Sequence, residues 1–469
     1  MSQLPAVELD HLRRSVRGRV VSAQDADYNL LRSGFNGMID RRPAAIVRVR
    51  SEADVAAAIQ FARQRDLPLA IRAGGHSAPG HFTCEGGLVV DCRELAAVAV
   101  DPARRSVRCG SGLTWRQFDA ATQAHGLAVT GGRVSSTGVT GLTIGSGSGW
   151  LERVQGLTSD SLTGARLVTA DGACVDTDDD PDLLWALRGG GGNFGVITEL
   201  RFALRPLGPT VLGGKRLYPV ERSADLLRTF GEVMLAAPPE LCGGLAFITA
   251  PPAPWVPAEL RGRIVVATIT LWAGHPADAV AGMAPLDALG PTLYDGVGSV
   301  RYTDIQQIMD PGAPAGWRDY FKGGFMRTLT EGAVHDIAAI GASMPAPLTQ
   351  VICAPLGAHT AYAAVGEDHS AIGHREEEWS FQVLSLWDRA EDDAVQKAWT
   401  RAAASTMSSY SELVSYPNFL TADEPADIDA AYAPAVLARL RAVKDRHDPD
   451  NVFRINNNIA PSRHADLVH

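Results

Sequence analysis

The stretch PLAIRAGGHSAPG, residues 68–80, combines a short apolar run with a glycine-rich ending. Residues 67–72 have the apolar and β-branched composition that is typical of a strand. Residues 44–50 predict a second strand, and the polar start and apolar periodicity of residues 51–64 predict a helix between the two. Together they predict a β-α-β unit of about 30 residues, which ends in a glycine loop that carries His76.

Glycine clusters recur further along the chain. GGRVSSTGVTGLTIGSGSG occupies residues 131–149 as a predicted loop, and GGGGNFG occupies residues 189–195. Glycine loops beside strands present backbone N–H groups that a diphosphate can bind without obstruction by side chains. Three such clusters before residue 200 favour a large dinucleotide ligand. The spacing of Gly145, Gly147 and Gly149 is not the Rossmann pattern, and no Gly-Lys-Ser/Thr follows to make a P-loop.

These motifs resemble those of a known superfamily. PLAIRAGGHSAPG is similar to the first flavin loop of the vanillyl-alcohol-oxidase superfamily, whose FAD-binding domain is of the PCMH type. TGVTGLTIGSGSGWLERVQGLTSD and WALRGGGGNFGVITEL resemble its next two signatures. The tail YPNFL…RLRAVKDRHDPDNVFRINNNI resembles the ending of the berberine-bridge-enzyme-like branch. The resemblance covers residues 20–206 and 410–460.

The resemblance implies an α+β fold with two parts. One is a PCMH-type FAD-binding domain of two subdomains, and the other is a substrate domain with an antiparallel sheet covered by helices. The glycine clusters end before Pro206 and Pro209, which mark a boundary in the sequence. We expect residues 1–206 to form the FAD-binding domain and residues 207–419 the substrate-binding domain. Residues 420–469, with a predicted helix over residues 427–446, are expected to return to the FAD domain.

The resemblance also implies how the cofactor is held. The histidine of the R-x-G-G-H motif, His76, would be joined through a ring nitrogen to the 8α-methyl group of FAD. A neutral imidazole is a nucleophile that can attack this position of an oxidised flavin. Some relatives form a second bond from a cysteine in G-x-C-x-x-x-G, but the aligned residues 132–138 have Val134 there. FAD is therefore expected to be monocovalent.

The other positions that the motifs assign to the cofactor are Arg72, Ala73, Gly74, Gly75, Ser77, Gly132, Thr137, Gly138, Gly141, Gly145, Gly149, Trp150, Gly192, Asn193, Gly195, Val196, Ile197, Asn456 and Asn458.

Two residues are candidates for catalysis. The Tyr-x-Asn motif contains Tyr416, and family members often use this tyrosine as the base that takes the substrate proton. Its alternative role is packing at the domain junction. In the alternating strand predicted over residues 377–387, Gln382 shares a face with Leu384 and Leu386. Gln382 is therefore either a substrate contact or a solvated position at a sheet edge.

The expected function is that of an FAD-dependent oxidase. A small organic substrate (an alcohol, phenol, amine or secondary-metabolite intermediate) would transfer hydride to the covalent flavin, and O2 would be reduced to H2O2. A flavin dehydrogenase with another acceptor and a non-catalytic drug-binding resistance flavoprotein remain as alternatives. Neither the substrate nor the oligomeric state follows from the sequence.

The composition excludes several other classes of protein. A net charge of −10 argues against nucleic-acid binding, and no apolar run approaches the roughly 20 residues that a membrane span needs. The six cysteines form no CxxC pair, so no metal site is expected. The absence of glycosylation sequons and of a signal-peptide pattern favours a cytoplasmic, bacterial setting.

Overall fold

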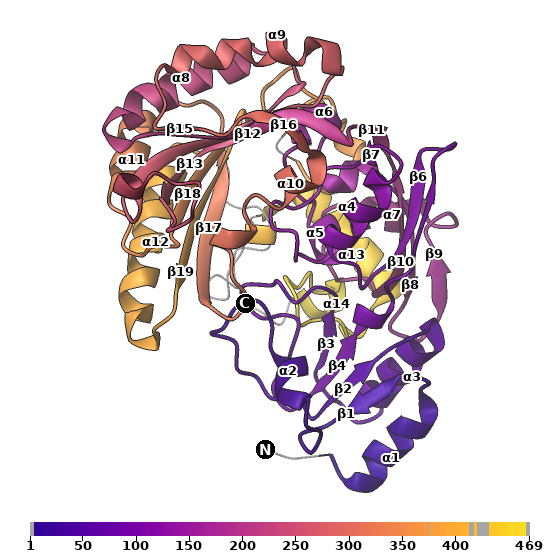
Figure 1. The fold of residues 1–469 in the computed structure, drawn as a ribbon. Helices are drawn as coiled ribbons and strands as arrows, with labels where there is room; N and C mark the ends of the chain where they lie inside the picture. The colour runs from indigo at the N-terminus through magenta and orange to yellow at the C-terminus, as the bar shows by residue number, and fades with distance from the viewer. Residues whose placement is uncertain (1–3, 374, 412–416, 420–430, 466–469) are drawn as a thin grey trace.

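The computed structural model describes residues 4–411 except 374, residues 417–419 and residues 431–465. Within these residues, the strands form a four-stranded, a five-stranded and an eight-stranded sheet, together with a two-stranded pair. Figure 1 shows the first two sheets in the lower and right-hand parts of the molecule, and the large sheet beside them.

The first sheet contains the predicted β-α-β unit. Its three parallel strands and one antiparallel edge strand follow the order β1-β2-β4-β3. Helix α3 (Glu52–Arg63) packs on it, and the Ser51 hydroxyl caps the helix by accepting the Asp54 N–H. The prediction of strand, capped helix and strand is confirmed, although a later strand lies between the two. The strands are β1 (Arg19–Val21), β2 (Ala45–Arg48), β3 (Leu69–Arg72) and β4 (Leu88–Asp91).

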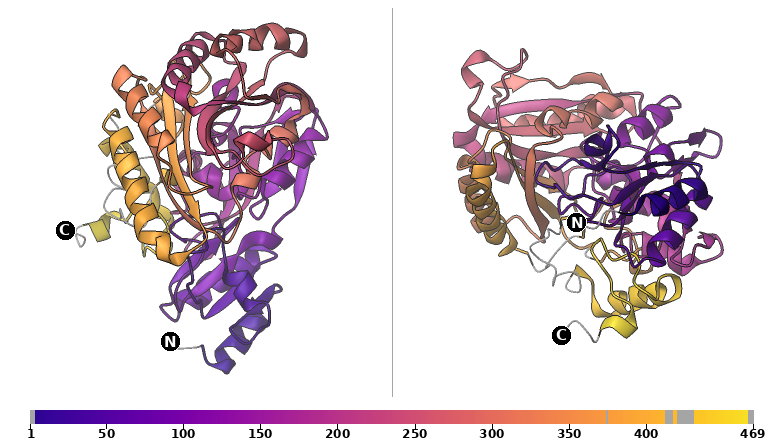
Figure 2. Two further views of the ribbon diagram at one scale, coloured as in Figure 1. Left: turned by 60° about the vertical axis from the view of Figure 1, so that its left-hand side comes forward. Right: turned by 90° about the horizontal axis from the view of Figure 1, so that it is seen from below.

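The second sheet is antiparallel and lies against helices from three parts of the chain. Trp115 and Phe118 of α4 (Trp115–Gln123), residues of α7 (Pro181–Leu187) and Leu440 of α13 (Pro434–His447) share its core. The C-terminal helix thus returns to the N-terminal half of the chain (Figure 2). The strands in order are β5 (Val98–Asp101), β6 (Ser106–Gly110), β10 (Val196–Ala203), β8 (Leu162–Val168) and β9 (Cys174–Asp176).

Two predicted boundaries were wrong. The glycine-rich segment 131–149 is not all loop, because it contains helix α5 (Val139–Ile144), whose buried side chains include Val139 and Thr143. Burial of this short helix overrides the low helix propensity of its glycine and threonines. The helix predicted over residues 427–446 begins instead at Pro434, which suits the first position of a helix because proline lacks an N–H to donate.

The large sheet is antiparallel and covered on one face by helices. Phe230, Phe247, Trp379 and Phe381 lie in the core between that face and the helices. Figures 1 and 2 show α8 (Ser223–Ala236), α9 (Ala279–Met283), α11 (Glu331–Ala342) and α12 (Asp393–Ser408) along the outside of the sheet. The predicted fold class, an α+β chain with a helix-covered antiparallel sheet, is confirmed.

The strands of the large sheet follow the order β15-β12-β14-β13-β18-β19-β17, and β16 also pairs with β12. Their bounds are β12 (Thr210–Pro219), β13 (Leu241–Thr249), β14 (Ile264–Trp272), β15 (Tyr294–Asp295), β16 (Gly298–Arg301), β17 (Arg318–Met326), β18 (Gln350–Pro355) and β19 (Trp379–Trp387).

The remaining elements are α1 (Ala6–Ser15), α2 (Tyr28–Arg32), α6 (Glu152–Gln155), α10 (Tyr302–Gln306), α14 (Ser462–Ala465) and the pair β7 (Leu127–Ala128) and β11 (Arg205–Pro206). The chain passes from this pair into the large sheet close to the domain limit predicted at residue 206. The limits themselves remain predictions. In the described part of the chain, no helix is both long and apolar enough to cross a membrane.

Candidate active site

The first two glycine clusters touch through bare backbone. A Cβ atom added to Gly74 would lie 2.3 Å from the Gly138 nitrogen, and one added to Gly138 would lie 2.5 Å from the Gly74 nitrogen. Gly75 also has a φ of +80°, which an L side chain rarely adopts. The two clusters therefore need glycine for contact with each other as well as for a ligand.

The third cluster and the C-terminal segment join the same assembly. The Gly191 N–H donates to the Ile144 carbonyl at 2.9 Å, at the end of α5. Asn193 donates to the Asn457 carbonyl at 3.1 Å, and its own Oδ1 accepts the Ile459 N–H at 2.9 Å. Three glycine clusters that are distant in sequence, together with the tail, thus form one surface.

A buried lysine fixes this junction. The Lys444 ammonium donates to Asp448 at 2.6 Å, to the Asn193 carbonyl at 2.8 Å and to the Phe453 carbonyl at 3.0 Å. All three of its donors are used, which a fully buried ammonium requires. The lysine therefore holds the third glycine cluster against the segment that follows α13.

The glycine surface forms one side of a cavity of about 420 Å³. This volume is within the range of about 300 to 1,000 Å³ that is usual for small-molecule sites. The opposite side is the uncovered face of the large sheet, with residues of β17, β18 and β19. The predicted residues that line the cavity are Ala73, Gly74, Gly75, His76, Ser77, Gly132, Thr137, Gly138, Gly141, Gly145, Gly192, Gly195, Ile197, Gln382 and Asn456.

Six of the predicted cofactor residues do not line the cavity. Arg72 is buried below it, where it donates to the Leu31 carbonyl at 2.5 Å. Trp150 is in a core cluster, with the Arg133 guanidinium 5.0 Å from its ring. The others are Gly149, Asn193 and Val196, which are buried, and Asn458, which is partly buried.

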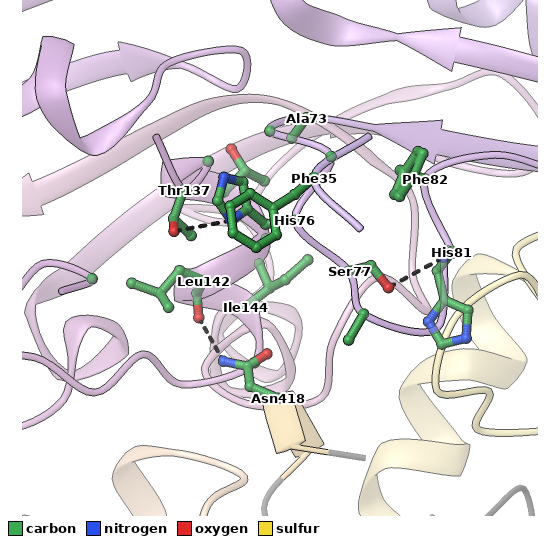
Figure 3. A pocket seen from close by; sticks show the side chains of 18 of the residues that line it. Phe35, Ala73, His76, Ser77, His81, Phe82, Thr137, Leu142, Ile144 and Asn418 are labelled. Carbon is green, nitrogen blue, oxygen red and sulfur yellow. Dashed lines mark hydrogen bonds between the residues drawn. The ribbon is translucent and has the colours of Figure 1, made fainter. Parts of the chain in front are cut away.

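His76 lies in the cavity wall beside the Thr137 hydroxyl and the Phe35 ring (Figure 3). Its Nε2 is 3.0 Å from the Ser136 Oγ, and its Nδ1 is 3.4 Å from the Thr137 Oγ1. The ring stacks on Phe35 with centroids 4.2 Å apart and 22° between the planes. The Phe35 N–H donates to the Gly75 carbonyl, so the stacking partner is attached to the same loop. These contacts hold the imidazole in one orientation.

The electrostatic environment keeps this imidazole neutral. Burial lowers the pKa of His76 from 6.5 to about 4, and the nearby charge of Arg72 acts in the same direction. At neutral pH the ring therefore has an unprotonated nitrogen with a free lone pair, which is the form that acts as a nucleophile.

Gln382 projects from an interior strand, since β19 lies between β18 and β17. Gln382, Leu384 and Leu386 all line the cavity, as the predicted alternation requires, while Trp379 and Phe381 point into the core under the helices. The position is therefore not at a sheet edge.

Tyr416 lies outside the described residues, but its motif can be located. Asn418 donates to the Leu142 carbonyl at 3.2 Å (Figure 3), and a Cβ on Gly145 would collide with the Asn418 side chain. Phe419 packs against Gly323 of β17, and both Asn418 and Phe419 line the cavity. The motif thus crosses from the glycine surface to the sheet.

Comparison with known proteins identifies the family. Residues 43–178 match the family described as an FAD binding domain, and residues 415–460 match the family described as berberine and berberine like. The chain belongs to the berberine-bridge-enzyme-like FAD-linked oxidoreductases. The enzyme is 28% identical over 453 residues to an FAD-linked oxidoreductase of Dictyostelium discoideum, a match that covers 95% of each chain.

Other relatives and solved structures align over nearly the whole of both chains. (R)-6-hydroxynicotine oxidase of Paenarthrobacter nicotinovorans is 27% identical over 473 residues, which cover 95% of this enzyme and 97% of that one. The structure of 6-hydroxy-D-nicotine oxidase from Arthrobacter nicotinovorans aligns with a TM-score of 0.84 at 24% identity over 96% of this chain and 99% of that chain. Xylooligosaccharide oxidase from Myceliophthora thermophila, solved with xylobiose, aligns at 0.83 and 19% identity over 97% and 99%. The structural matches show a common PCMH-type fold.

The cavity fits FAD. A Cβ on Gly141 would meet no protein atom within 4 Å, so the enzyme leaves open space above this part of the glycine surface. The buried Asn456 Oδ1, on a lining residue, has no hydrogen-bond partner among the described residues and can accept one from a ligand. The glycine backbone at Gly192 and Gly195 and the neutral His76 complete a set suited to a diphosphate and a flavin.

Several residues that line the cavity of the enzyme were not predicted from the sequence. Phe35 lies between Gly34 and Gly37. These two glycines were the only local sign in the sequence that other segments pack closely against this one. Gln350 and Asp319 come from β18 and β17, in the region that resembles the family only loosely. Their roles depend on which face of each strand points inward, which requires the register of the sheet.

Replacement of Gly138 by alanine tests whether the glycine clusters need to touch. The added methyl group would overlap the Gly74 backbone, and overpacking of this kind costs about 1 to 3 kcal/mol of unfolding free energy. We expect a lower melting temperature and a lower flavin-to-protein absorbance ratio. Gly298→Ala in β16, where a Cβ meets nothing within 4 Å, is the matched control. Wild-type stability and flavin content in Gly138→Ala would contradict this interpretation.

Proposed function

We propose that the enzyme is an oxidase that holds FAD through a single bond to His76 and oxidises a small organic substrate, with O2 as the electron acceptor. The observation that carries the proposal is the cavity itself. It brings the glycine surface and a neutral, oriented His76 to one side, and a sheet face with Gln382 to the other. Cofactor and substrate can therefore meet in one cavity.

When bound, FAD would accept a hydride from the substrate and pass two electrons to O2, which yields H2O2. The chain would supply the remaining functions. The half-buried Gln382 offers an amide that can donate to and accept from a substrate. Tyr416 would take the substrate proton as hydride leaves, two positions before the cavity-lining Asn418.

The single bond is supported by the lack of a reactive cysteine among the described residues that line the cavity. Val134 lines the cavity at the position where some relatives have a bonding cysteine, and valine cannot form a thioether. Cys92 also lines the cavity, but burial raises the pKa of its thiol to about 12. A thiol that stays protonated is a poor nucleophile.

Anaerobic mixing tests this function. We expect one member of a panel of alcohols, phenols and amines to bleach the yellow flavin without O2. Admission of air should then restore the colour and release one H2O2 for each substrate oxidised. Reduction without reoxidation by O2 would indicate a dehydrogenase. Tight binding of a coloured aromatic drug with no flavin reduction by any panel member would indicate the non-catalytic resistance protein.

A further inference from the structure

Strand β17 places one carboxyl group in the active-site cavity. Alternate residues of β17 face opposite sides, and Asp319 and Phe321 line the cavity. The neighbouring Arg318 faces the other way, where it pairs with Asp393 of α12. Asp319 is the sole carboxylate among the described residues that line the cavity.

The strand register fixes the neighbours of Asp319. Asp319 pairs with Leu386, two residues on Phe321 pairs with Leu384, and a further two on Gly323 pairs with Gln382. Asp319 is therefore separated from the Gln382 row by four residues, about 13 Å along the strand. Its immediate neighbours on the sheet face, across the pair and along the strand, are Leu386 and Phe321, which are apolar.

The carboxyl group is buried and unpaired, on a backbone that Asn36 holds. Asp319 is 4% exposed, and its Oδ1 has no hydrogen-bond partner among the described residues. Asn36 holds the backbone of Asp319 on both sides: its Oδ1 accepts the Asp319 N–H at 3.1 Å, and its Nδ2 donates to the carbonyl at 2.8 Å. The backbone that carries the side chain is therefore held in place. The buried carboxylate itself lacks the hydrogen-bond donor or counter-ion that it needs.

No cation of the cavity supplies that partner. The basic side chains that line it, among the described residues, are His76, His81 and Arg133. Burial lowers the pKa of each histidine to about 4, so both are neutral at pH 7. Arg133 is already paired with Glu152 at 2.7 Å. Burial alone raises the pKa of Asp319 from 3.8 to about 7, with no charged neighbour contributing.

We propose that Asp319 determines substrate specificity by pairing with a positively charged nitrogen of the substrate, at the end of the cavity away from Gln382. The inference rests on the proposed oxidase function, and it names the substrate as an amine with an aromatic or aliphatic body. The ammonium group would neutralise the carboxylate, and Phe321, Leu384 and Leu386 would contact the apolar body.

The test compares amines with alcohols of the same shape. Phenylalkylamines of increasing chain length, and the matching phenylalkanols, are titrated into the flavin-loaded enzyme at pH 8, with binding followed by flavin absorbance and by thermal shift. We expect at least one amine to bind wild type tenfold or more tightly than its alcohol, and Asp319→Asn to abolish that preference. Asp388→Asn, an exposed aspartate just after β19, should keep it.

The affinity of the enzyme for amines should decrease at low pH. Asp319 is ionised only above its pKa of about 7, so amine affinity should fall as the pH is lowered through 7.

The stability of the ligand-free enzyme should also depend on pH. Between about pH 4 and 7 the Asp319 carboxyl stays protonated in the folded enzyme but loses its proton in the unfolded chain, so stability falls as the pH rises through that window. Asp319→Asn should therefore raise the melting temperature at pH 8 more than at pH 5.

Two outcomes would overturn the inference. If no amine of the series binds wild type more tightly than it binds Asp319→Asn, the carboxylate is not a cation anchor. A preference for hydrogen-bond acceptors such as ketones, lost in the variant, would mean that the protonated acid acts as a donor instead. Amine preference without flavin reduction by any alcohol, phenol or amine of the panel would leave the anchor intact and refute the oxidase function.

Discussion

Tyr416→Phe is expected to slow anaerobic reduction of the flavin by substrate about 100- to 10,000-fold, the usual range for loss of a general base. The change removes the hydroxyl and keeps the ring, so packing should be preserved. Melting temperature and flavin content should therefore stay near those of wild type. Reoxidation of the reduced enzyme by O2 should be almost unchanged, because that step does not require the proton acceptor.

The two half-reactions separate catalysis from packing. If Tyr416 only fills space at the junction of the glycine surface and the sheet, Tyr416→Phe should change the rate of neither flavin reduction nor reoxidation. The nearby Phe419, which packs on Gly323, gives a matched control: Phe419→Leu should affect stability or substrate affinity more than the reduction rate constant at saturation. Equal reduction rates in wild type and Tyr416→Phe would require another base.

His76→Ala is expected to abolish covalent attachment of FAD. The protein should still fold and bind FAD reversibly, because the glycine clusters and the tail that meets them are untouched. Turnover should fall, since loss of the 8α-substituent is expected to lower the flavin potential. The measurements are the fraction of flavin that stays with acid-precipitated protein, and the flavin potential.

His81→Ala is the matched control for this variant. His81 lies on the same loop, lines the same cavity and has a similarly lowered pKa, but its backbone N–H donates to the Ser77 hydroxyl and its ring lies apart from His76 (Figure 3). It should keep covalent FAD. Covalent flavin and unchanged activity in His76→Ala would refute the assigned linkage.

Features of the fold that depend on residues close together in the sequence could be predicted. The first strand-helix-strand unit follows from apolar periodicity and the Ser51 cap, both of which lie within a few residues. The division of β19 into two faces follows from the alternation around Gln382, although the sequence left open whether the Gln382 face lines the site. In the same way, the third glycine cluster, after α7, could be recognised from the sequence, because consecutive glycines are typical of a loop whose backbone approaches a ligand closely.

Features that depend on distant segments were not predictable. The contact between Gly74 and Gly138 joins two clusters more than sixty residues apart, and nothing near either glycine indicates it. The face of β17 was equally hidden, because RDYFKGGFM mixes polar and apolar residues without alternation. Asp319 could therefore be placed in the cavity only through its register with β19.

The most direct test of the central claim, a single bond between FAD and His76, is fragmentation mass spectrometry of the flavin peptide. Trypsin should release residues 73–93, which contain His76, His81, Cys84 and Cys92 as possible attachment sites. We expect this peptide alone to carry the flavin mass, with fragment ions that assign it to His76. Flavin on His81 or on a cysteine, on a second peptide, or wholly in the acid supernatant would contradict the claim.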